Sequence, residues 1–273
     1  MNIRLRIPAD VVRAVAGRWP DNAAEWGTSA ERELSAICTR YRAIPRTVMP
    51  ARYGFVVASD APTGPLIMRA SPDPAGPQQA MVSQTLASLR IAPKVHEVVS
   101  TTTGTWVIMD RVRPGDRLTN CRRSGLDVSG ALAAMLRPMV GQLAPCPMPS
   151  LADWIQGRLE DDELADLAPN RSVAPLHQRR NALAILKDLR VGGNDGLCHG
   201  DASSGNVLVG GNGLMLIDPR GMSGEVEYDA AVAALKIAGQ TRPTDIAERL
   251  SRLIGIDTER IKAWVAVADA ARV

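Results

Sequence analysis

The sequence predicts an α+β chain in two parts, a small β-rich part with one main helix and a larger, mostly helical part. Short apolar and β-branched runs broken by Pro and Gly lie between residues 46 and 111, interrupted by one helical pattern over residues 77–90. After Arg113 the apolar spacing becomes helical along most of the chain. We therefore expect an N-terminal lobe of residues 1–112 and a C-terminal lobe of residues 113–273.

Two helices should precede the sheet of the N-terminal lobe. Apolar residues at helical spacing predict the first over residues 9–18, and Thr28 followed by Glu31 is a capping box that predicts the second over residues 29–42. The strands of the sheet, which we expect to be antiparallel, should follow in residues 46–59, 65–70, 94–99 and 105–111.

The C-terminal lobe should be helical with one hairpin. Helices are expected near residues 127–143, 150–168, 175–190, 227–238, 243–253 and 258–271, the first of them interrupted at Pro138. Between the third and the fourth lie two short apolar runs, residues 206–209 and 214–217, joined by Gly-Gly-Asn-Gly. That tetrapeptide predicts a β-hairpin.

Composition indicates a folded globular protein and argues against two kinds of partner. Hydrophobic residues make up 45% of the 273 residues and charged residues 22%, which is ordinary globular usage. The 32 basic and 29 acidic residues are mixed along the chain, and aromatic residues are only 3%, so a nucleic-acid partner is not expected. No apolar signal core or membrane-length apolar run is present, so no membrane partner is expected either.

Four cysteines lie far apart in the sequence without a Cys-x-x-Cys pair: Cys38, Cys121, Cys146 and Cys198. Reduced thiols in a cytoplasmic protein are the simplest interpretation. The sequence does not indicate an oligomeric state, and we assume a monomer.

The segment Cys198–Pro219 carries residue types suited to phosphoryl transfer. Such a reaction needs a carboxylate for the attacking hydroxyl and oxygen ligands for magnesium. Asp201 and Asn206 lie five positions apart, as in the catalytic loop of protein kinases, and the hairpin should bring Asp218 back beside Asn206. Each aspartate alone is explained as well by capping a turn. Turn capping does not explain the whole string, which predicts transfer from a nucleoside triphosphate to a hydroxyl.

This segment resembles the aminoglycoside phosphotransferase superfamily, whose catalytic loop reads His-Gly-Asp and later Gly-Asn, and whose metal-binding turn reads Ile-Asp. Through residues 220–224 and 228–231 it looks most like the branch of streptomycin 6-kinases and hydroxyurea-resistance kinases. The resemblance implies a two-lobed protein-kinase-like fold in which the N-terminal lobe binds ATP and the C-terminal lobe binds the acceptor.

The same resemblance implies roles for individual residues. Asp201 would be the catalytic residue, and His199 would brace the loop rather than act as the base. Asn206 and Asp218 would be the magnesium ligands. In the hinge after the last strand of the N-terminal lobe, backbone groups near Asp110 and Val112 would meet the adenine edge.

The nucleotide side departs from the family pattern. The lysine expected on the third strand is replaced by Arg69, and the glutamate expected on the following helix is replaced by Gln79, or by Gln78 or Gln84 in another alignment. A guanidinium is not equivalent to an ammonium at a tight phosphate site. Three interpretations stay open: an active kinase with modified phosphate contacts, a different alignment, or a nucleotide-binding protein with little catalysis.

Aminoglycosides are polycations, so their kinases need carboxylates on the acceptor side. The candidates are two residues of an acidic run, three residues after the metal turn and one aromatic wall: Glu160, Asp161, Glu225, Glu227, Asp229 and Trp264. The alternatives are a solvated helix face for the acidic run, a helix N-terminal position for Asp229 and a core position for Trp264.

We therefore expect an ATP- and magnesium-dependent phosphotransferase that acts on a hydroxyl of a small molecule, with an aminoglycoside-type antibiotic such as streptomycin as the first acceptor. Hydroxyurea, a peptide antibiotic, a metabolite or a protein are alternative acceptors. A nucleotide-binding, pseudokinase-like regulator is the non-enzymatic alternative. An Ala-Pro-Glu activation segment is not recognisable, which argues against a conventional protein kinase.

Overall fold

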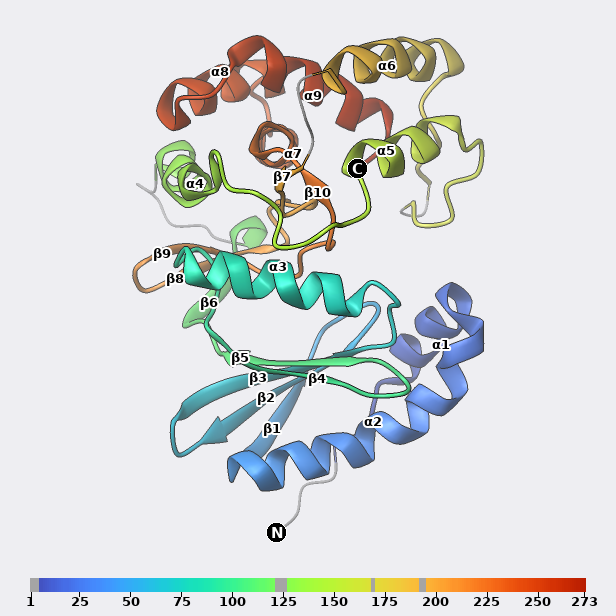
Figure 1. Cartoon of the computed structure of the whole chain (residues 1–273), viewed down its shortest axis with the longest axis vertical. Coiled ribbons are helices and arrows are strands. Elements are labelled where there is room, and N and C mark those ends of the chain that lie inside the picture. The colour runs from blue at the N-terminus through green and yellow to red at the C-terminus, as the bar shows by residue number, and fades with distance from the viewer. Residues whose placement is uncertain (1–4, 121–126, 168–169, 192–194) are drawn as a thin grey trace. The chain divides into compact units, whose positions relative to one another are not determined.

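The computed structural model describes residues 5–120, 127–167, 170–191 and 195–273, so Cys121 and residue 168 of the second C-terminal helix prediction lie outside the described residues. Figure 1 shows the chain coloured by residue number. The chain divides into two compact units. One comprises Met1–Ala80 and Pro93–Val112, and the other comprises Met81–Ala92 and Arg113–Val273. Residues 81–92, part of the N-terminal lobe in the sequence prediction, thus group with the second unit.

The first unit is built on a five-stranded antiparallel sheet in the order β1-β2-β3-β5-β4. Its strands are β1 (Ile44–Met49), β2 (Phe55–Ala61), β3 (Gly64–Ser71), β4 (Val95–Ser100) and β5 (Thr105–Asp110). The predicted strand regions and their antiparallel pairing are confirmed. The β-branched and apolar residues of β2, β3 and β5 fill the core of this unit, which fits their central places in the sheet.

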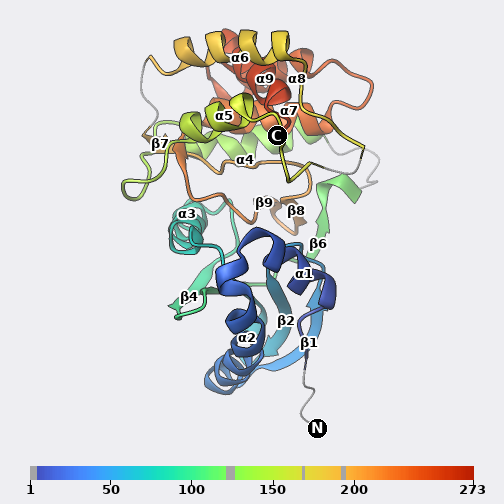
Figure 2. The ribbon, with the colours of Figure 1, turned by 90° about the vertical axis from the view of Figure 1, so that its right-hand side faces the viewer.

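Two helices, α1 (Ala9–Arg18) and α2 (Pro20–Tyr41), cover one face of that sheet (Figure 2). Trp26 and Leu34 of α2 pack in one apolar cluster with Phe55 and Trp106 of the sheet. The prediction that the second helix begins at residue 29 is wrong. Proline is tolerated in a first helical turn, so Pro20 opens the helix, and the Thr28 hydroxyl bonds back to the Glu25 carbonyl (3.0 Å) instead of capping.

The second unit is mostly helical, as predicted. Its helices are the last residues of α3 (Gly76–Ser88), α4 (Val128–Leu136), α5 (Leu151–Glu160), α6 (Leu176–Leu189), α7 (Val226–Ile237), α8 (Pro243–Ile254) and α9 (Thr258–Ala270). Short 3-10 turns follow at η1 (Leu118–Asn120) and η2 (Arg137–Met139). Pro138 lies in η2, where the loss of a backbone donor ends the regular helix, and α5 ends at Glu160 rather than near residue 168.

The hairpin of the second unit is confirmed as β8 (Val207–Gly210) and β9 (Gly213–Leu216), with Gly210 paired to Gly213. The sequence did not predict β6 (Pro114–Arg117), which pairs with β8, or the two-residue strands β7 (Gly196–Leu197) and β10 (Ser223–Gly224). Strands this short carry too few residues for an alternating pattern.

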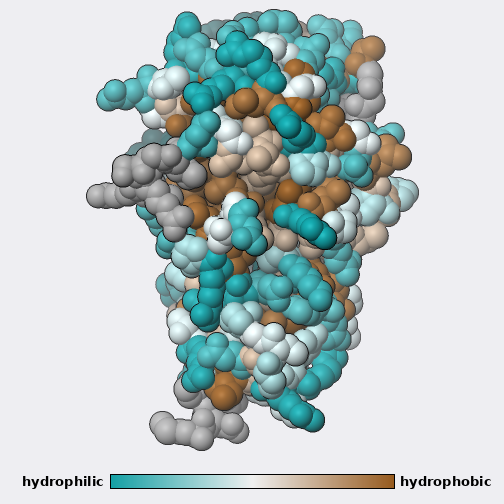
Figure 3. Space-filling model, turned by 90° about the vertical axis from the view of Figure 1, so that its left-hand side faces the viewer, coloured by the Kyte–Doolittle hydropathy of each residue, from teal (hydrophilic) through white to brown (hydrophobic). Residues whose placement is uncertain are grey.

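Helix α7 is the most enclosed helix of the second unit and packs against α8 and α9. Four alanines at its centre, Ala230, Ala231, Ala233 and Ala234, allow this close packing. In the side view of Figure 3, hydrophobic residues reach the surface among hydrophilic ones in the upper part of the molecule. No helix in the described part of the chain has the length and apolar character that crossing a membrane requires.

Candidate active site

The predicted catalytic residues lie on a loop, residues 198–206, and on the turn after the hairpin, residues 217–222. The N–H of Ile217 donates a 2.9 Å hydrogen bond to the carbonyl of Asn206. The hairpin therefore returns the chain to Asn206 one residue before Asp218. A two-residue turn between paired strands fixes this register, because each strand residue has a set partner across the hairpin.

His199 is fully buried and braces the loop. Its Nδ1 accepts the backbone N–H of Asp201 (3.2 Å), so the ring proton is on Nε2, which donates to the carbonyl of Ile217 (2.9 Å). Burial lowers the pKa of His199, with the charge of Asp201 opposing the shift. A neutral ring whose two nitrogens are both engaged ties the loop to the turn after the hairpin.

Asp229, on the first turn of α7, holds the same loop from the other side. Its carboxylate is fully buried and accepts the backbone N–H groups of His199 (2.7 Å) and Gly200 (2.9 Å). Burial raises the pKa of Asp229 to about 7, although both backbone hydrogen bonds favour the ionised form. The helix N-terminal position considered for Asp229 is confirmed. The expected contact of Asp229 with the acceptor is not found, because the loop backbone N–H groups occupy both carboxylate oxygens.

The Asp201 carboxylate is partly exposed and faces Arg220. A nitrogen of the guanidinium lies 3.5 Å from Asp201 Oδ2, and Arg220 Nε donates to the carbonyl of Gly200 (3.0 Å). The guanidinium also lies over the ring of Trp154, 4.3 Å from its centroid. Gly200 has φ +80°, and a Cβ there would lie 3.0 Å from Arg220 Cβ, so a glycine is needed at this position.

No sequence motif assigns a role to Arg220. Its only signal is its place directly after the Ile-Asp-Pro turn, in the string that carries the family resemblance. The contact with Trp154 brings together residues far apart in the chain, and no local pattern announces it.

Asn206 and Asp218 provide oxygen atoms that fit magnesium. The amide Nδ2 of Asn206 donates to the Asp201 carbonyl (3.1 Å), which fixes the amide and leaves Oδ1 as its ligand atom. Asp218 has φ +62°, a conformation that Asp and Asn tolerate better than most residues. The described residues contain no cluster of three His, Cys, Asp or Glu side chains suited to a metal. Magnesium fits this donor set, since it commonly takes one or two protein ligands and completes its shell with phosphates and water.

In the first unit, Arg69 on β3 and Gln79 on α3 are brought together. A guanidinium nitrogen of Arg69 lies 3.5 Å from Gln79 Oε1, and Gln79 Nε2 donates to Asp73 Oδ2 (2.8 Å). Of the three glutamines that the sequence left open, Gln79 is therefore the one beside Arg69. Its amide serves as acceptor and donor at once, which a carboxylate cannot do.

A protein family described as a phosphotransferase enzyme family matches residues 54–264 of the chain. The chain belongs to this family. The match spans both the strand that carries Arg69 and the whole catalytic loop, and it confirms the predicted membership in the superfamily of aminoglycoside phosphotransferases. No curated protein matches the chain significantly.

Solved structures share the fold of this phosphotransferase. A choline/ethanolamine kinase family protein from Mesorhizobium loti has a TM-score of 0.64 at 16% identity, over 90% of this chain and 83% of the other. Aminoglycoside phosphotransferase APH(3'')-Id from Streptomyces rimosus, in complex with ADP and streptomycin, has a TM-score of 0.60 at 14% identity, over 89% and 98%. Spectinomycin phosphotransferase APH(9)-Ia, in complex with ADP and spectinomycin, has a TM-score of 0.57 at 13% identity, over 88% and 86%. The predicted protein-kinase-like fold is thereby confirmed.

The expected hinge of the phosphotransferase follows β5. The carboxylate of Asp110 bonds His96 Nε2 (2.6 Å), and the backbone N–H of Asp110 donates to the carbonyl of Lys94 (2.9 Å). The next N–H, of Arg111, donates to the carbonyl of Pro65 (2.9 Å). These contacts fix the backbone that leads to Val112, and they occupy the N–H groups of the two residues before it.

Two of the residues expected at the acceptor, Glu225 and Trp264, bond one another in the interior. The Glu225 carboxylate accepts the indole N–H of Trp264 and pairs with Arg260 Nε (2.6 Å). Trp264 is buried, with its ring at an edge-on 5.3 Å from Tyr228. The structure therefore supports the alternative of a core position for Trp264. Glu225 pairs with Arg260, which lies on α9 like Trp264.

The remaining acidic candidates lie at the end of α5 and in the first turn of α7. Glu160 is exposed on the last turn of α5, where it accepts a hydrogen bond from Gln156 (2.8 Å), and Asp161 caps that helix end. Glu227 is half-buried on α7, and burial raises the pKa of its carboxyl group. The acidic run after α5 is thus mainly a solvated helix end, the alternative considered from the sequence.

Proposed function

We propose that this phosphotransferase moves the γ-phosphoryl group of ATP, with Mg²⁺, to a hydroxyl group of a small molecule in the cytoplasm. The observation that supports this most directly is the placement of Asp201, Asn206 and Asp218 on one braced loop and hairpin. The ADP bound in two of the similar structures supports ATP as the phosphoryl donor.

Asp201 is the proposed catalytic residue. Its partly exposed carboxylate accepts a hydrogen bond from the acceptor hydroxyl and orients that oxygen toward the γ-phosphorus. The new oxygen–phosphorus bond forms as the bond to the ADP oxygen breaks, and the hydroxyl proton passes to the carboxylate. Because His199 and Asp229 fix the loop backbone, the carboxylate needs little reorganisation as the reaction proceeds.

The phosphate groups and the metal require further residues. Asn206 and Asp218 would hold the magnesium ion, which supplies charge neutralisation on the phosphates when bound. In the first unit, Arg69 takes the place of the usual lysine and offers a planar fork of donors to the phosphates. Because the N–H groups of Asp110 and Arg111 are already bonded, the remaining backbone groups from Asp110 to Val112 would meet the adenine edge.

The acceptor is the finer part of the proposal. The resemblance of residues 217–232 makes streptomycin the first compound to test, and the streptomycin-bound similar structure supports that choice. Hydroxyurea, peptide antibiotics, other metabolites and a protein side chain complete the panel, together with choline and ethanolamine because of the similarity to their kinase family.

The proposal is tested by the turnover of Asp201→Asn across this panel. We expect kcat to fall by about 10³-fold or more while nucleotide affinity stays within about twofold, because the carboxylate acts on the hydroxyl and not on the nucleotide. ADP release and product mass are the measurements. Asp188→Asn, a change of an exposed carboxylate on α6, is the matched control. Equal product formation by wild type and Asp201→Asn would contradict the enzyme proposal and favour the nucleotide-binding regulator.

A further inference from the structure

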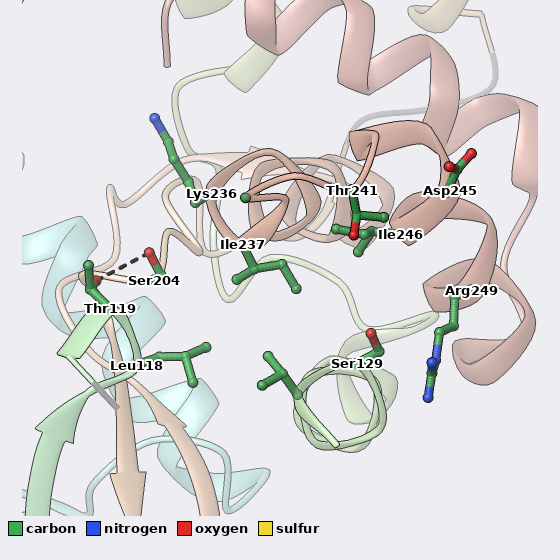
Figure 4. Close-up of a pocket in the computed structure, with 12 residues that line it drawn as sticks. Leu118, Thr119, Ser129, Ser204, Lys236, Ile237, Thr241, Asp245, Ile246 and Arg249 are labelled. Carbon is green, nitrogen blue, oxygen red and sulfur yellow. Dashed lines mark hydrogen bonds between the residues drawn. The ribbon is translucent and has the colours of Figure 1, made fainter. Parts of the chain in front are cut away.

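A cavity of about 560 Å³ lies in the second unit, next to the catalytic loop. It is lined by η1, the start of α4, the end of α7 and the first turns of α8 (Figure 4). Its size falls within the range of small-molecule sites. Nothing in the mechanism proposed above uses this cavity.

The cavity is connected to Asp201 through Ser204, which lies three residues after it in the same loop and lines the cavity wall. Thr119 of η1 fixes that residue twice. Its backbone N–H donates to the Ser204 carbonyl (3.2 Å), and the two hydroxyls bond one another (3.2 Å), as the dashed line in Figure 4 shows. Lys236 also lines the cavity, and burial lowers its pKa while the charge of Asp201 opposes the shift. The cavity therefore shares part of its wall with the loop that carries Asp201.

Apolar and hydroxyl side chains form the interior. Leu118 and Ile237 point into the same space in Figure 4, with Val128 and Ile246 also in the lining. The hydroxyl groups are those of Thr119, Ser129, Ser204 and Thr241. Such a lining offers hydrogen bonds and apolar contact to a ring that carries hydroxyl groups.

The charged ends at the rim are directed away from this space and have partners of their own. Figure 4 shows the ends of Lys236, Asp245 and Arg249 pointing outward. Asp245 pairs with Arg242 (2.8 Å), Arg249 pairs with Asp127 (3.0 Å), and Lys236 bonds the carbonyl oxygen of Val273. Among the lining residues that the structure describes, Asp245 alone carries a carboxylate, and Arg242 already pairs with it. A cationic ligand group would therefore have to compete with Arg242 for that carboxylate, and an unpaired buried charge is costly.

We propose that this cavity binds the acceptor, and that the acceptor is an uncharged, hydroxyl-bearing compound of the sugar or cyclitol kind rather than a polycation. The proposal rests on the function proposed above, because it assigns the acceptor side of the same reaction. The family resemblance of residues 217–232 favours streptomycin as the acceptor, whereas the cavity favours an uncharged molecule.

Matched pairs of acceptors test the charge preference. Choline and its uncharged isostere 3,3-dimethylbutan-1-ol have nearly the same shape, and myo-inositol can be compared with streptomycin as a cyclitol without guanidinium groups. We expect kcat/KM to be at least about tenfold higher for the uncharged member of each pair. If choline and streptomycin were the preferred acceptors, and their turnover were lost in Asp201→Asn, the proposed phosphotransfer would stand. The assignment of the acceptor to this cavity would then be wrong.

A second measurement tests the location. Ser129→Asp adds a carboxylate to the cavity wall at the start of α4, where a negative charge is compatible with the helix. We expect KM for the uncharged acceptor to rise about tenfold, KM for ATP to stay the same, and the preference in each pair to move toward the cation. Ser35→Asp, on the exposed side of α2, is the matched control. Identical acceptor preferences in the two variants would place the acceptor elsewhere and overturn the proposal.

Discussion

The catalytic loop of the second unit and the Arg69–Gln79 pair of the first unit are held in different ways. Five hydrogen bonds of 2.7 to 3.2 Å fix the loop backbone and Asn206, and two of them end on the buried carboxylate of Asp229. Arg69 and Gln79 approach one another only to 3.5 Å, and Gln79 makes its shorter bond to Asp73. The loop is held by short hydrogen bonds, whereas the contact between Arg69 and Gln79 is a longer one.

This difference fits the tasks proposed for the two regions. An acceptor hydroxyl must be oriented within a fraction of an ångström, so a carboxylate on a braced loop is an advantage. Phosphate groups are bound largely through charge, and a guanidinium can reach them from more than one rotamer.

The largest effect is expected from the pH dependence of Asp229. Burial raises its pKa to about 7, against roughly 3.9 in an unfolded chain. Between these values the folded protein keeps a proton that the unfolded chain has released, so stability from this group is complete below about pH 4 and is lost as the pH rises to 7. Relative to Asp229→Asn, the wild type should therefore lose about 2 to 3 kcal/mol of unfolding free energy between pH 5 and pH 8.

Urea unfolding of the two proteins at both pH values measures this change, and taking the difference cancels the groups they share. Asp188→Asn, on the exposed side of α6, should not alter the slope. If the wild type instead gained stability relative to Asp229→Asn, the carboxylate would be ionised in the folded protein, and its bonds to the loop would outweigh its burial.

The second effect concerns Arg220, which joins Asp201 to Trp154. Arg220→Lys keeps the charge but loses the bond from Nε to Gly200 and most of the contact with the indole ring. We expect kcat to fall about tenfold while KM for ATP is unchanged, because a loss of about 1.4 kcal/mol is typical of such contacts. Steady-state kinetics measure both constants.

A double-mutant cycle separates positioning of Asp201 from general stability. Trp154→Leu should lower kcat in the same direction, and adding it to Arg220→Lys should cost little more, since both changes remove one contact. Arg252→Lys, at an exposed position of α8, is the control. If the losses of kcat in the two single variants were fully additive, Arg220 would not position Asp201. The same conclusion would follow if each fall in kcat were accompanied by a fall in melting temperature.

The loop could be predicted because its key residues are close in sequence. The three residues Asp201, Asn206 and Asp218 lie within 18 positions. The tetrapeptide Gly-Gly-Asn-Gly predicts the turn that brings Asp218 back beside Asn206. Asp229 and Trp154 come from separate helices, and only the packing of α7 and α5 brings them to the loop. The spacing of charged residues likewise did not show that Glu225 would be occupied by Arg260 and Trp264 in the interior.

The predicted start of α2 was wrong because the same sequence pattern occurs at helix starts and inside helices. A threonine followed three residues later by a glutamate marks many helix starts, but in α2 the same residues lie inside the helix. Thr28 there bonds a carbonyl of the preceding turn, and Glu31 accepts the backbone N–H of Ile7 (3.2 Å). The nucleotide side was harder for a related reason, since the choice among three glutamines depends on how α3 is rotated against β3.

The smallest effect is expected at Gln79, which belongs to the pair with the longer contact. Gln79→Glu restores the usual residue type beside the phosphate-binding cation, but it places a second carboxylate against Asp73, which now receives a 2.8 Å bond from the amide. We expect KM for ATP to rise about threefold, a change of the size that partly exposed charge pairs produce. Adding Asp73→Asn should restore the wild-type KM, because the new amide can donate to Glu at position 79. Gln84→Glu, exposed on the same helix, controls for added charge. Tighter ATP binding in the single variant would mean that Arg69 needs a full counter-charge, as the lysine does elsewhere in the family, and that the weak contact seen here is not an adaptation to the guanidinium.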